Sequence, residues 1–336
     1  MIIIGAGPAG LSCAIELQKS GKTVLLVDKK KHIGPKVCAG GLTTKIKDLG
    51  IPLETAEILF SKALVSVSDK TLPILNKTPF VGTIDRGRLG DFLLNKLEDK
   101  ITVSKGCEVS QIGEGFIVAN KKKIEYKYLV GADGSNSMVR KFLGLETKKF
   151  LLAIQYLIHT RNNNLEICFD TDFFGPGYGW VFPHKGYASV GCCQDIRYFG
   201  GSRLRKGFDK WLAKKKIDVS NVTLEGWTIN FDYQGFEFGN KFLVGDAGGF
   251  ASGLTGEGIY FGLISGKDVA RRIINPEYKC KGIEQILKVK IYHENTLATV
   301  RFLIKIFKGS SNYLFKFLFG FMKNKRIQKK LIKRFV

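Results

Sequence analysis

Three glycines near the start of the chain have the spacing of a turn that binds a phosphate group. Gly5, Gly7 and Gly10 lie between an apolar run at residues 2–4 and a segment with helical spacing at residues 8–20. Glycine at these positions allows a tight turn, a close approach of the backbone to a pyrophosphate, and close packing of helix against strand. The pyrophosphate then lies at the helix N-terminus, where backbone N–H groups favour an anion. The sequence therefore predicts a dinucleotide-binding turn.

Three aspartates could provide the carboxylates of the same site. Asp28, Asp133 and Asp246 each end or closely follow a short apolar run, and Asp28 lies 18 residues after Gly10. At that distance a carboxylate is suitably placed to accept a hydrogen bond from a ribose hydroxyl. In doubly wound sheets, ligands bind beside the carboxyl ends of the strands. We therefore expect all three carboxylates near the glycine turn.

The apolar patterns that must position these residues predict an α/β (α+β) fold. We expect a Rossmann-type domain with an inserted antiparallel substrate-binding sheet and a C-terminal helical segment. Residues 101–126 predict an antiparallel meander. Strands of the inserted sheet are expected near residues 151–160, 165–170, 178–183 and 187–193, with a helix near residues 202–215.

Three segments together resemble those of the p-hydroxybenzoate hydroxylase superfamily of flavoproteins, which includes the geranylgeranyl reductases. They are G-x-G-x-x-G at residues 5–10, G-A-D-G-x-x-S-x-V-R at residues 131–140, and G-D-A at residues 245–247. The resemblance implies FAD as cofactor, with Asp246 at the ribityl chain. Because the chain has a single G-x-G-x-x-G, the electron donor, NAD(P)H or ferredoxin, is expected to bind transiently.

By the same resemblance, Arg86 lies by the cofactor and residues 256–258 approach the flavin ring. The full set of expected cofactor-binding residues is Gly5, Gly7, Ala9, Gly10, Asp28, Lys29, Lys36, Cys38, Ala39, Arg86, Asp133, Gly134, Gly245, Asp246, Gly256, Gly258 and Ile259. No metal site is expected, since the seven cysteines include no C-x-x-C pair.

A stripe of aromatic residues is the expected substrate pocket. Tyr178, Trp180 and Phe182 fall on one face of a strand by period-two alternation. Such a stripe is as often plain core. With Pro183, however, it matches Y-x-W-x-F-P, which resembles the substrate-pocket signature of geranylgeranyl reductases, enzymes that saturate prenyl chains. The family's proline three residues before the tyrosine is here Gly175, and Pro176 follows it.

A single cysteine lies in a second segment with this resemblance. Residues 34–43 are similar to the cysteine- and glycine-containing segment that geranylgeranyl reductases place against the flavin, and aromatic hydroxylases lack that cysteine. A lone cysteine is more often an inert buried residue, but Cys38 lies close to Lys36 and a Gly-Gly pair. We expect Cys38, Tyr178 and Trp180 to be the catalytic residues.

Reduction of an isolated C=C bond requires a proton as well as a hydride. No carbonyl group draws electrons from such a bond, so a proton must reach one carbon as hydride reaches the other. Aromatic faces such as those of Tyr178 and Trp180 could stabilise the developing cation. A thiol is a poor acid for an alkene. The sequence leaves open whether Cys38 gates the site, shields it or relays a proton.

The end of the chain is both basic and aromatic. Residues 301–336 contain 11 Lys or Arg and no Asp or Glu, within a chain of net charge +23. Apolar residues recur at helical spacing on both sides of residues 309–311, which predicts two short amphipathic helices. They are typical of an interfacial anchor on an anionic membrane surface. A solvated helical hairpin packed on the domain is the alternative.

The remaining expectations concern organisation and location. We expect a cytoplasmic protein, peripheral on the membrane surface, with no nucleic-acid partner and an undetermined oligomeric state. The expected domains are FAD-binding (1–55, 80–150 and 232–275), substrate-binding sheet (56–79 and 151–231) and C-terminal basic amphipathic helices (276–336).

The pattern as a whole predicts an FAD-dependent reductase of isoprenoid chains. The substrate would be a digeranylgeranyl-glycerolipid, a similar prenyl-lipid, or a polyprenyl quinone. A monooxygenase of the same fold acting on another apolar molecule is the main alternative, and it would consume oxygen together with NAD(P)H. A non-catalytic prenyl carrier would not need all three FAD segments. An RNA-modifying flavoprotein would show salt-dependent RNA binding.

Overall fold

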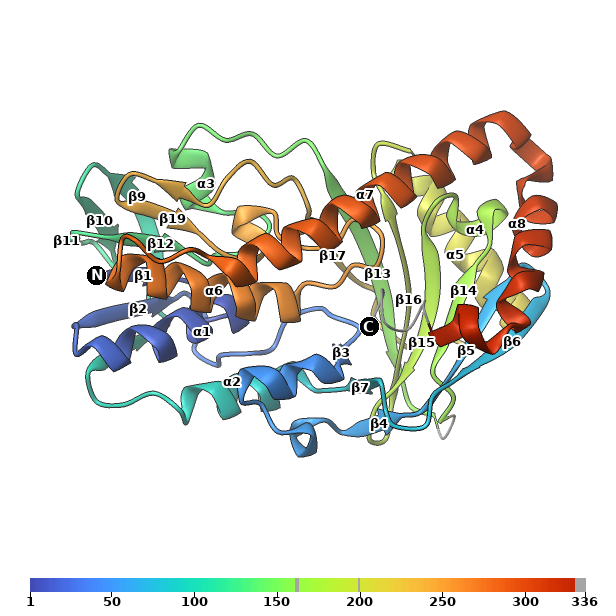
Figure 1. Cartoon of the computed structure of the whole chain (residues 1–336), viewed down its shortest axis with the longest axis horizontal. Coiled ribbons are helices and arrows are strands. Elements are labelled where there is room, and N and C mark those ends of the chain that lie inside the picture. The colour runs from blue at the N-terminus through green and yellow to red at the C-terminus, as the bar shows by residue number, and fades with distance from the viewer. Residues whose placement is uncertain (161–162, 199, 330–336) are drawn as a thin grey trace.

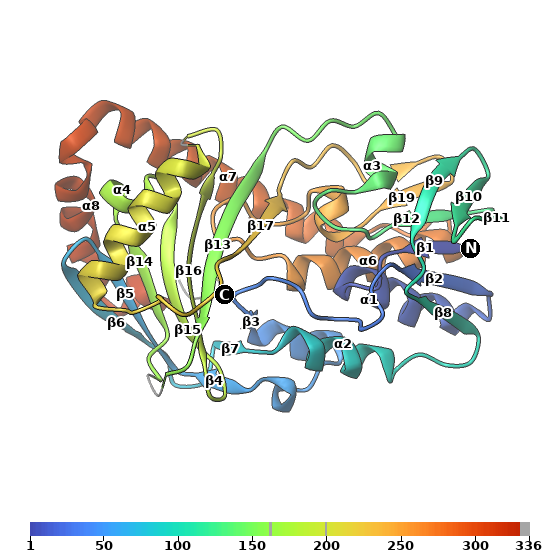
Figure 2. The same ribbon diagram turned by 180° about the vertical axis from the view of Figure 1, so that it is seen from behind.

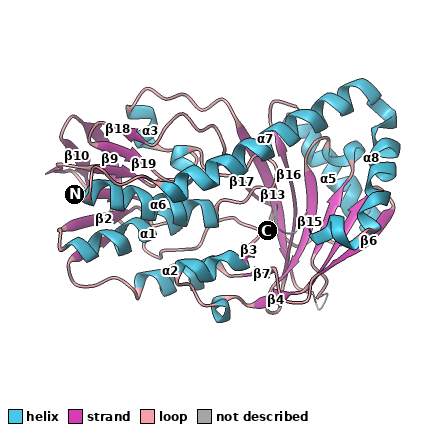
Figure 3. Cartoon of the chain, in the orientation of Figure 1, coloured by secondary structure: helices cyan, strands magenta, loops and turns pink. Residues whose placement is uncertain are grey.

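Two large β-sheets lie at opposite ends of the molecule, and the chain crosses between them repeatedly (Figure 1). The computed structural model describes residues 1–160, 163–198 and 200–329. One sheet is mainly parallel and the other mainly antiparallel, and helices cover both (Figure 3). The predicted fold class is confirmed, including the helical C-terminal segment.

The first sheet follows from short apolar runs that are buried on both faces, as parallel strands must be. Its order is β18-β19-β12-β1-β2-β8, and only β18 runs antiparallel to its neighbour. The strands are β1 (Ile2–Ile4), β2 (Val24–Asp28), β8 (Ile101–Lys105), β12 (Leu129–Gly131), β18 (Glu237–Phe238) and β19 (Lys241–Leu243).

Helices and a small meander cover this first sheet. Helices α1 (Pro8–Leu17), α2 (Arg86–Leu94) and α6 (Ile259–Ile274) share one core with one face. Helix α3 (Met138–Phe142) and the antiparallel strands β9 (Val109–Gly113), β10 (Phe116–Ala119) and β11 (Lys122–Glu125) share another core with the opposite face. The predicted meander is thus confirmed for residues 109–125, whereas residues 101–105 join the parallel sheet.

The second sheet has seven strands in the order β17-β13-β16-β15-β14-β5-β6. All neighbours are antiparallel except β14 and β5. The strands are β5 (Lys62–Val67), β6 (Lys70–Leu75), β13 (Phe150–Ile158), β14 (Glu166–Phe169), β15 (Tyr178–Pro183), β16 (Ala188–Asp195) and β17 (Glu225–Asn230). The four predicted strands between residues 151 and 193 are therefore confirmed.

Two helices cover the outer face of the second sheet, as the view from behind shows (Figure 2). Helix α5 (Gly201–Lys215) matches the predicted helix, and Leu204, Phe208, Trp211 and Leu212 bury one apolar side of it. The short helix α4 (Thr171–Phe174) packs beside α5. The inner face of the sheet is left facing the first sheet.

A third, three-stranded sheet joins the two halves. Its strands are β3 (Gly41–Thr43), β4 (Ile58–Phe60) and β7 (Val81–Thr83), with β7 in the middle. It takes β3 and β7 from the predicted FAD-binding domain and β4 from the predicted substrate-binding domain. The domain boundaries themselves stay a prediction.

The C-terminal helices differ from the expectation of two short ones. Helix α7 is continuous over Lys281–Phe307, so the segment from Arg301 is its last part, and α8 follows at Ser311–Gly320. Helix α7 runs from the first sheet along the molecule to α8, which lies beside the second sheet (Figure 1). Within the described part of the chain, no helix combines the length and apolar character needed to cross a membrane.

Candidate active site

A cavity of about 820 Å³ lies between the two large sheets. The loops that follow β1, β2, β12 and β19 line one side, and the inner face of the seven-stranded sheet lines the other. Thr296 and Val300 of α7 also line it. Every expected site residue lines this cavity except Gly10 and Pro183. Residues from all parts of the sequence between Gly5 and Ile259 therefore meet in one place.

The glycine turn has the geometry that a bound pyrophosphate requires. A Cβ atom on Gly10 would lie 1.9 Å from the carbonyl oxygen of Gly5, so only glycine lets α1 pack so closely on the turn. A Cβ atom on Gly7 would meet no protein atom within 4 Å. Gly7 is the N-cap of α1, and no side chain caps this helix. The helix N-terminus is thus open toward the cavity and suited to an anion.

Asp28 lies at the end of β2, next to this turn. Its Oδ2 accepts a hydrogen bond from the Ala6 N–H at 2.7 Å, and its Oδ1 accepts one from the Lys30 N–H at 2.8 Å. The carboxylate is therefore fixed against the backbone while it lines the cavity. A carboxylate oxygen can accept more than one hydrogen bond, so a ribose hydroxyl can share it. The exposed Lys29 lies beside it at the cavity rim.

The other two predicted aspartates have different surroundings. Asp133 accepts hydrogen bonds from Ser137 Oγ at 2.5 Å and the Met138 N–H at 2.6 Å, so its carboxylate holds the turn before α3. Burial raises its pKa. Asp246 instead accepts from Lys36 Nζ at 3.1 Å and from Ser135 Oγ at 3.2 Å.

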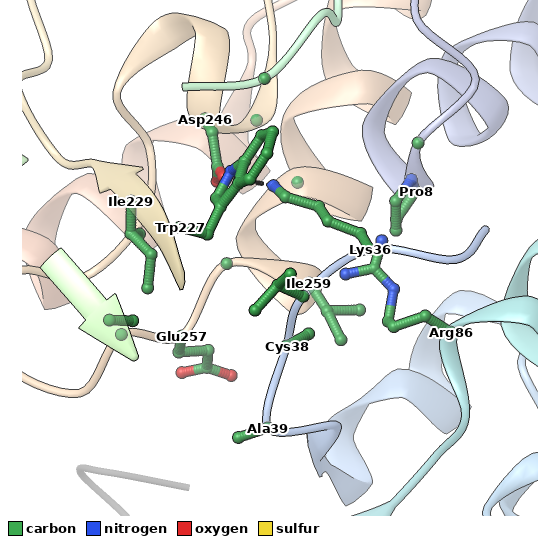
Figure 4. Close-up of a pocket in the computed structure, with 18 of the residues that line it drawn as sticks. Pro8, Lys36, Cys38, Ala39, Arg86, Trp227, Ile229, Asp246, Glu257 and Ile259 are labelled. Atoms are coloured by element: carbon green, nitrogen blue, oxygen red, sulfur yellow. Dashed lines mark hydrogen bonds and ion pairs between the residues drawn. The ribbon is translucent and has the colours of Figure 1, made fainter. Parts of the chain in front are cut away.

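The Lys36–Asp246 pair joins the loop after β2 to the loop after β19 inside the cavity. Figure 4 shows Lys36 reaching toward Asp246 beside Trp227, and the Lys36 Nζ atom lies 5.4 Å from the centre of the Trp227 ring. A bound ligand with hydroxyl groups would find both a donor and an acceptor here. The assignment of Asp246 to the ribityl chain stays a prediction.

Arg86, the first residue of α2, points into the cavity (Figure 4). Its Nε atom is buried and has no hydrogen-bond partner among the described residues. A buried guanidinium N–H without a partner is costly, and an anionic or carbonyl group in the cavity would supply the missing acceptor. Together with the open helix N-terminus, this arrangement fits FAD.

The aromatic stripe lies on the cavity side of the second sheet. Tyr178, Trp180 and Phe182 follow one another along β15, with ring centres 6.0 and 6.4 Å apart. The polar atoms of the first two rings have partners within the protein. The Tyr178 hydroxyl donates to the Thr255 carbonyl at 2.5 Å, and Trp180 Nε1 donates to Ser189 Oγ at 2.9 Å. Both rings are therefore held in fixed orientations.

Pro183 has a structural role at the end of the same strand. Its carbonyl oxygen accepts a hydrogen bond from Thr83 Oγ1 at 2.6 Å, which ties β15 to β7. It does not line the cavity, unlike its neighbour Phe182. Pro183 was expected in the pocket but lies beside it, because successive residues of a strand point to opposite faces of the sheet and Phe182 faces the cavity.

The loop that carries Cys38 lies between the two sheets and lines the cavity. Cys38 is partly exposed, whereas the other six cysteines are buried. The loop is held from the second sheet by His184, whose Nε2 donates to the Ala39 carbonyl at 3.1 Å. The other ring nitrogen, Nδ1, lies 2.6 Å from Glu57 Oε2. A buried pair from distant parts of the chain thus positions Cys38.

Glu257 and Cys193 are cavity residues that were not among the individual site residues expected from the sequence, although residues 256–258 were expected as a segment to approach the flavin ring. Glu257 lies between Gly256 and Gly258, two expected site residues, and its carboxylate lies in the cavity on the side of Cys38 and Ala39 (Figure 4). Its local signal was an acidic residue between two glycines just before a helix. Cys193 pairs with Tyr178 across β15 and β16. Only the strand register reveals that position.

The chain has recognisable relatives. A profile described as pyridine nucleotide-disulphide oxidoreductase matches residues 1–164. An uncharacterized protein of Methanosarcina barkeri is 31% identical over 296 residues, covering 83% of this chain and 75% of the relative. Digeranylgeranylglycerophospholipid reductase 3 of Methanosphaera stadtmanae is 28% identical over 324 residues, covering 85% and 80%.

Solved structures share the fold at lower sequence identity. A geranylgeranyl bacteriochlorophyll reductase-like protein of Thermoplasma acidophilum superposes with a TM-score of 0.73 at 17% identity, covering 99% of this chain and 90% of the other. The p-nitrophenol 4-monooxygenase PnpA of Pseudomonas putida superposes with a TM-score of 0.74 at 14% identity, covering 99% and 96%. The fold alone therefore does not separate reductases from monooxygenases.

Fold, site and relatives together define an FAD-binding oxidoreductase. Within that class, the chain belongs to the geranylgeranyl reductase family.

Proposed function

We propose that this protein uses FAD to reduce the isolated C=C bonds of isoprenoid chains carried on a lipid. The observation that carries the proposal is the shared cavity: the aromatic face of β15 and the flavin-binding loops line one space, with the Cys38 loop between them. The relative from Methanosphaera stadtmanae is named for reduction of a digeranylgeranyl-glycerophospholipid. A lipid of that type is the first substrate to test, and a polyprenyl quinone is the second.

The residues of the chain have separate tasks in this reaction. The open N-terminus of α1 and Arg86 bind the cofactor's phosphates, and Lys36 with Asp246 orients its polar chain. When bound, reduced FAD supplies the hydride. The faces of Tyr178 and Trp180 stabilise the positive charge that develops on the alkene carbon. The apolar lining excludes water, which would otherwise compete for that carbon.

Anaerobic turnover tests the proposal directly. The FAD-loaded protein, reduced with dithionite, is mixed with digeranylgeranylglycerophospholipid, and the lipid is analysed by mass spectrometry. We expect a mass gain of one hydrogen pair for each bond reduced. An unchanged lipid mass with both substrates would contradict the proposal. Replacing dithionite with NAD(P)H or with reduced ferredoxin then identifies the electron donor.

The same assay in air separates the two reaction classes. A reductase converts the lipid without stoichiometric oxygen consumption, whereas a monooxygenase consumes oxygen and adds an oxygen atom to its substrate. We expect the first result, because the aromatic stripe and the Cys38 segment match reductases. An oxygen-containing product would identify the protein as a monooxygenase instead.

We also propose that the C-terminal helices place the protein on an anionic membrane surface. Phe302, Ile306, Tyr313, Phe317 and Phe321 are all exposed, at spacings that bring them onto common helix faces. Residues 301–336 carry 11 Lys or Arg and no Asp or Glu, which suits anionic headgroups. Residues 330–336 of this expected surface lie outside the described part of the chain.

Helix α7 connects this surface to the cavity. Thr296 and Val300 line the cavity, and the exposed Phe302 and Ile306 follow within two turns of the same helix. A prenyl chain could therefore pass from the bilayer along α7 into the cavity. This path would spare the chain exposure to water, which costs about 0.8 kcal/mol for each CH₂ group.

Vesicle flotation tests the membrane proposal. We expect the protein to float with vesicles containing anionic phospholipid, less so with neutral vesicles or at high salt. The double variant Phe317→Asp, Phe321→Asp should lose flotation without losing its fold, because both side chains are more than half exposed. Ile291→Asp, at an exposed position in the first half of α7 and outside the proposed surface, is the control. Equal flotation of all three proteins would contradict the proposal.

A further inference from the structure

Glu257 is a carboxylate of the cavity to which the preceding mechanism gives no task. It lies at the start of α6, where the chain leaves the loop after β19. The backbone on both sides is fixed: the Glu257 N–H donates to Thr255 Oγ1 at 3.3 Å, and its carbonyl accepts from the Ser252 N–H at 2.9 Å. The side chain is thus held toward the cavity, on the side of Cys38 and Ala39 (Figure 4).

Four other carboxylates line the cavity: three of them have partners and the fourth, that of Glu108, is exposed, whereas Glu257 is neither paired nor exposed. Asp28 and Asp133 accept backbone N–H groups, and Asp246 pairs with Lys36. Across residues 1–160, 163–198 and 200–329, the Glu257 carboxylate forms neither a hydrogen bond nor an ion pair. A half-buried carboxyl group without a partner favours its protonated form, because no donor stabilises the anion.

The electrostatic surroundings act in the same direction. Burial raises the pKa of Glu257 to about 7, and the positive charge of Lys45 opposes that shift only partly. The ionisable groups around it are Tyr178 on β15, Tyr260 on α6 and, through Tyr178, Cys38 and Cys193. At neutral pH a substantial part of the population therefore carries a proton on Glu257.

The alternative proton donors around the cavity are weaker acids. Burial raises the pKa of Tyr178 well above its usual value, and its O–H is already donated to the Thr255 carbonyl. Burial also raises the pKa of the Cys193 thiol to about 12. Thiols as a class are weaker acids than carboxyl groups by about four pKa units in model compounds.

We propose that the Glu257 carboxyl group is the proton donor in the reduction of the isoprenoid C=C bond. This inference rests on the proposed function. The O–H bond of Glu257 breaks and a C–H bond forms at one alkene carbon, while the other carbon receives hydride from reduced FAD. The alkene thus gains one hydrogen pair and the flavin is left oxidised. The carboxylate then regains a proton from water, and NAD(P)H or ferredoxin reduces the flavin again.

Three variants of the full chain test this assignment in single-turnover reactions. Glu257→Gln keeps the size of the side chain but has no acidic proton, and we expect the rate of the reduction step to fall by about 10²- to 10⁴-fold. FAD content and the KM for the lipid should change by less than about threefold, because the lost interaction belongs to the transition state. Glu257→Asp should restore part of the rate. Glu284→Gln, at an exposed position on α7, is the matched control.

Infrared spectroscopy supplies a readout that does not depend on turnover. The C=O band of a protonated carboxyl group should disappear in the wild type between about pH 5 and about pH 9. The same titrating band should be missing from Glu257→Gln and present in Glu284→Gln. The pH profile of the reduction rate in the wild type should follow this titration.

Failure of the inference and failure of the proposed function give different results. A wild type that reduces the lipid, together with Glu257→Gln that does so at the same rate and with the same pH profile, overturns the role of Glu257 alone. An infrared titration that is identical in both proteins overturns it as well. A wild type that reduces neither lipid nor quinone under any donor overturns the proposed function, and the role of Glu257 with it.

Discussion

The two walls of the cavity differ in how far apart in the sequence their interacting residues lie. The wall on the first sheet includes a turn whose residues act within a few positions of one another, namely Gly5, Gly7 and Gly10. The wall on the second sheet is made of side chains whose partners are far away in the sequence, as with Tyr178 and Thr255. The glycine turn is therefore a local property of this chain, whereas the fixed orientation of the aromatic stripe is a long-range one.

The largest expected effect lies in the first wall. Gly10→Ala would place a Cβ atom 1.9 Å from the Gly5 carbonyl oxygen, so α1 must move away from the turn. We expect a loss of about 4 kcal/mol or more in unfolding free energy, together with loss of bound FAD. Chemical denaturation and flavin absorbance measure the two effects.

Gly7→Ala is the matched control for that substitution. Its Cβ atom would meet only open cavity, so the protein should fold with a loss of about 1 kcal/mol or less. FAD affinity should still fall, because the methyl group occupies the space of the pyrophosphate. If both variants keep FAD, the glycine turn does not determine cofactor binding, and the contrast between the two walls fails.

The next effect concerns pH and belongs to Glu257, in the loop between β19 and α6. The folded-state pKa of Glu257 is raised by burial from 4.5 to about 7, so its contribution to stability is fully present below pH 4.5 and is lost as pH rises through 7. Between these limits the wild type should lose up to about 3 kcal/mol relative to Glu257→Gln, at 1.36 kcal/mol for each pKa unit. Urea denaturation at a series of pH values measures this difference. A pH-independent difference between the two proteins would show that the carboxyl group is not buried in the folded protein.

A smaller effect is expected at the contact between the walls. His184→Leu removes the hydrogen bond to the Ala39 carbonyl and leaves Glu57 buried without its partner. We expect a loss of about 1–3 kcal/mol in unfolding free energy. Because Cys38 is the partly exposed thiol and the other six are buried, faster alkylation of the protein would report a loosened Cys38 loop. An unchanged alkylation rate would mean that the loop does not need His184.

The smallest effect should come from the aromatic stripe. Tyr178→Phe removes one hydrogen bond to the Thr255 carbonyl and keeps the ring, so unfolding free energy should fall by about 0.5–1.5 kcal/mol. Turnover should fall while FAD content stays at the wild-type level, since the two walls act separately. If this variant loses FAD, the aromatic stripe also contributes to cofactor binding, and the two walls do not act separately.

The same contrast explains how far the sequence could be interpreted alone. The parallel sheet, the strand of Tyr178 and the helix at residues 201–215 follow from apolar periodicity, and the glycine turn follows from a motif within six residues. The bond between His184 and Glu57 spans 127 positions and leaves no local signal. Helix α7 was expected to begin near residue 301. Its earlier turns bury the polar Lys290 and His293 at positions where an apolar residue would have signalled a helix, and these turns pack against α6.

The first turn of α8 determines how the exposed aromatic residues are presented. Asn312 forms four hydrogen bonds with the first turn of α4, through Asp170, Thr171 and Asp172, and Ser311 bonds Thr171 as well. The helix is therefore folded and attached to the rest of the protein in the absence of a bilayer. Amphipathic segments that fold only on binding lose about 1–2 kcal/mol of backbone entropy for each residue ordered. In this protein the loss is part of folding, so on the proposed membrane surface the aromatic side chains would act as a rigid wedge with fast and reversible binding.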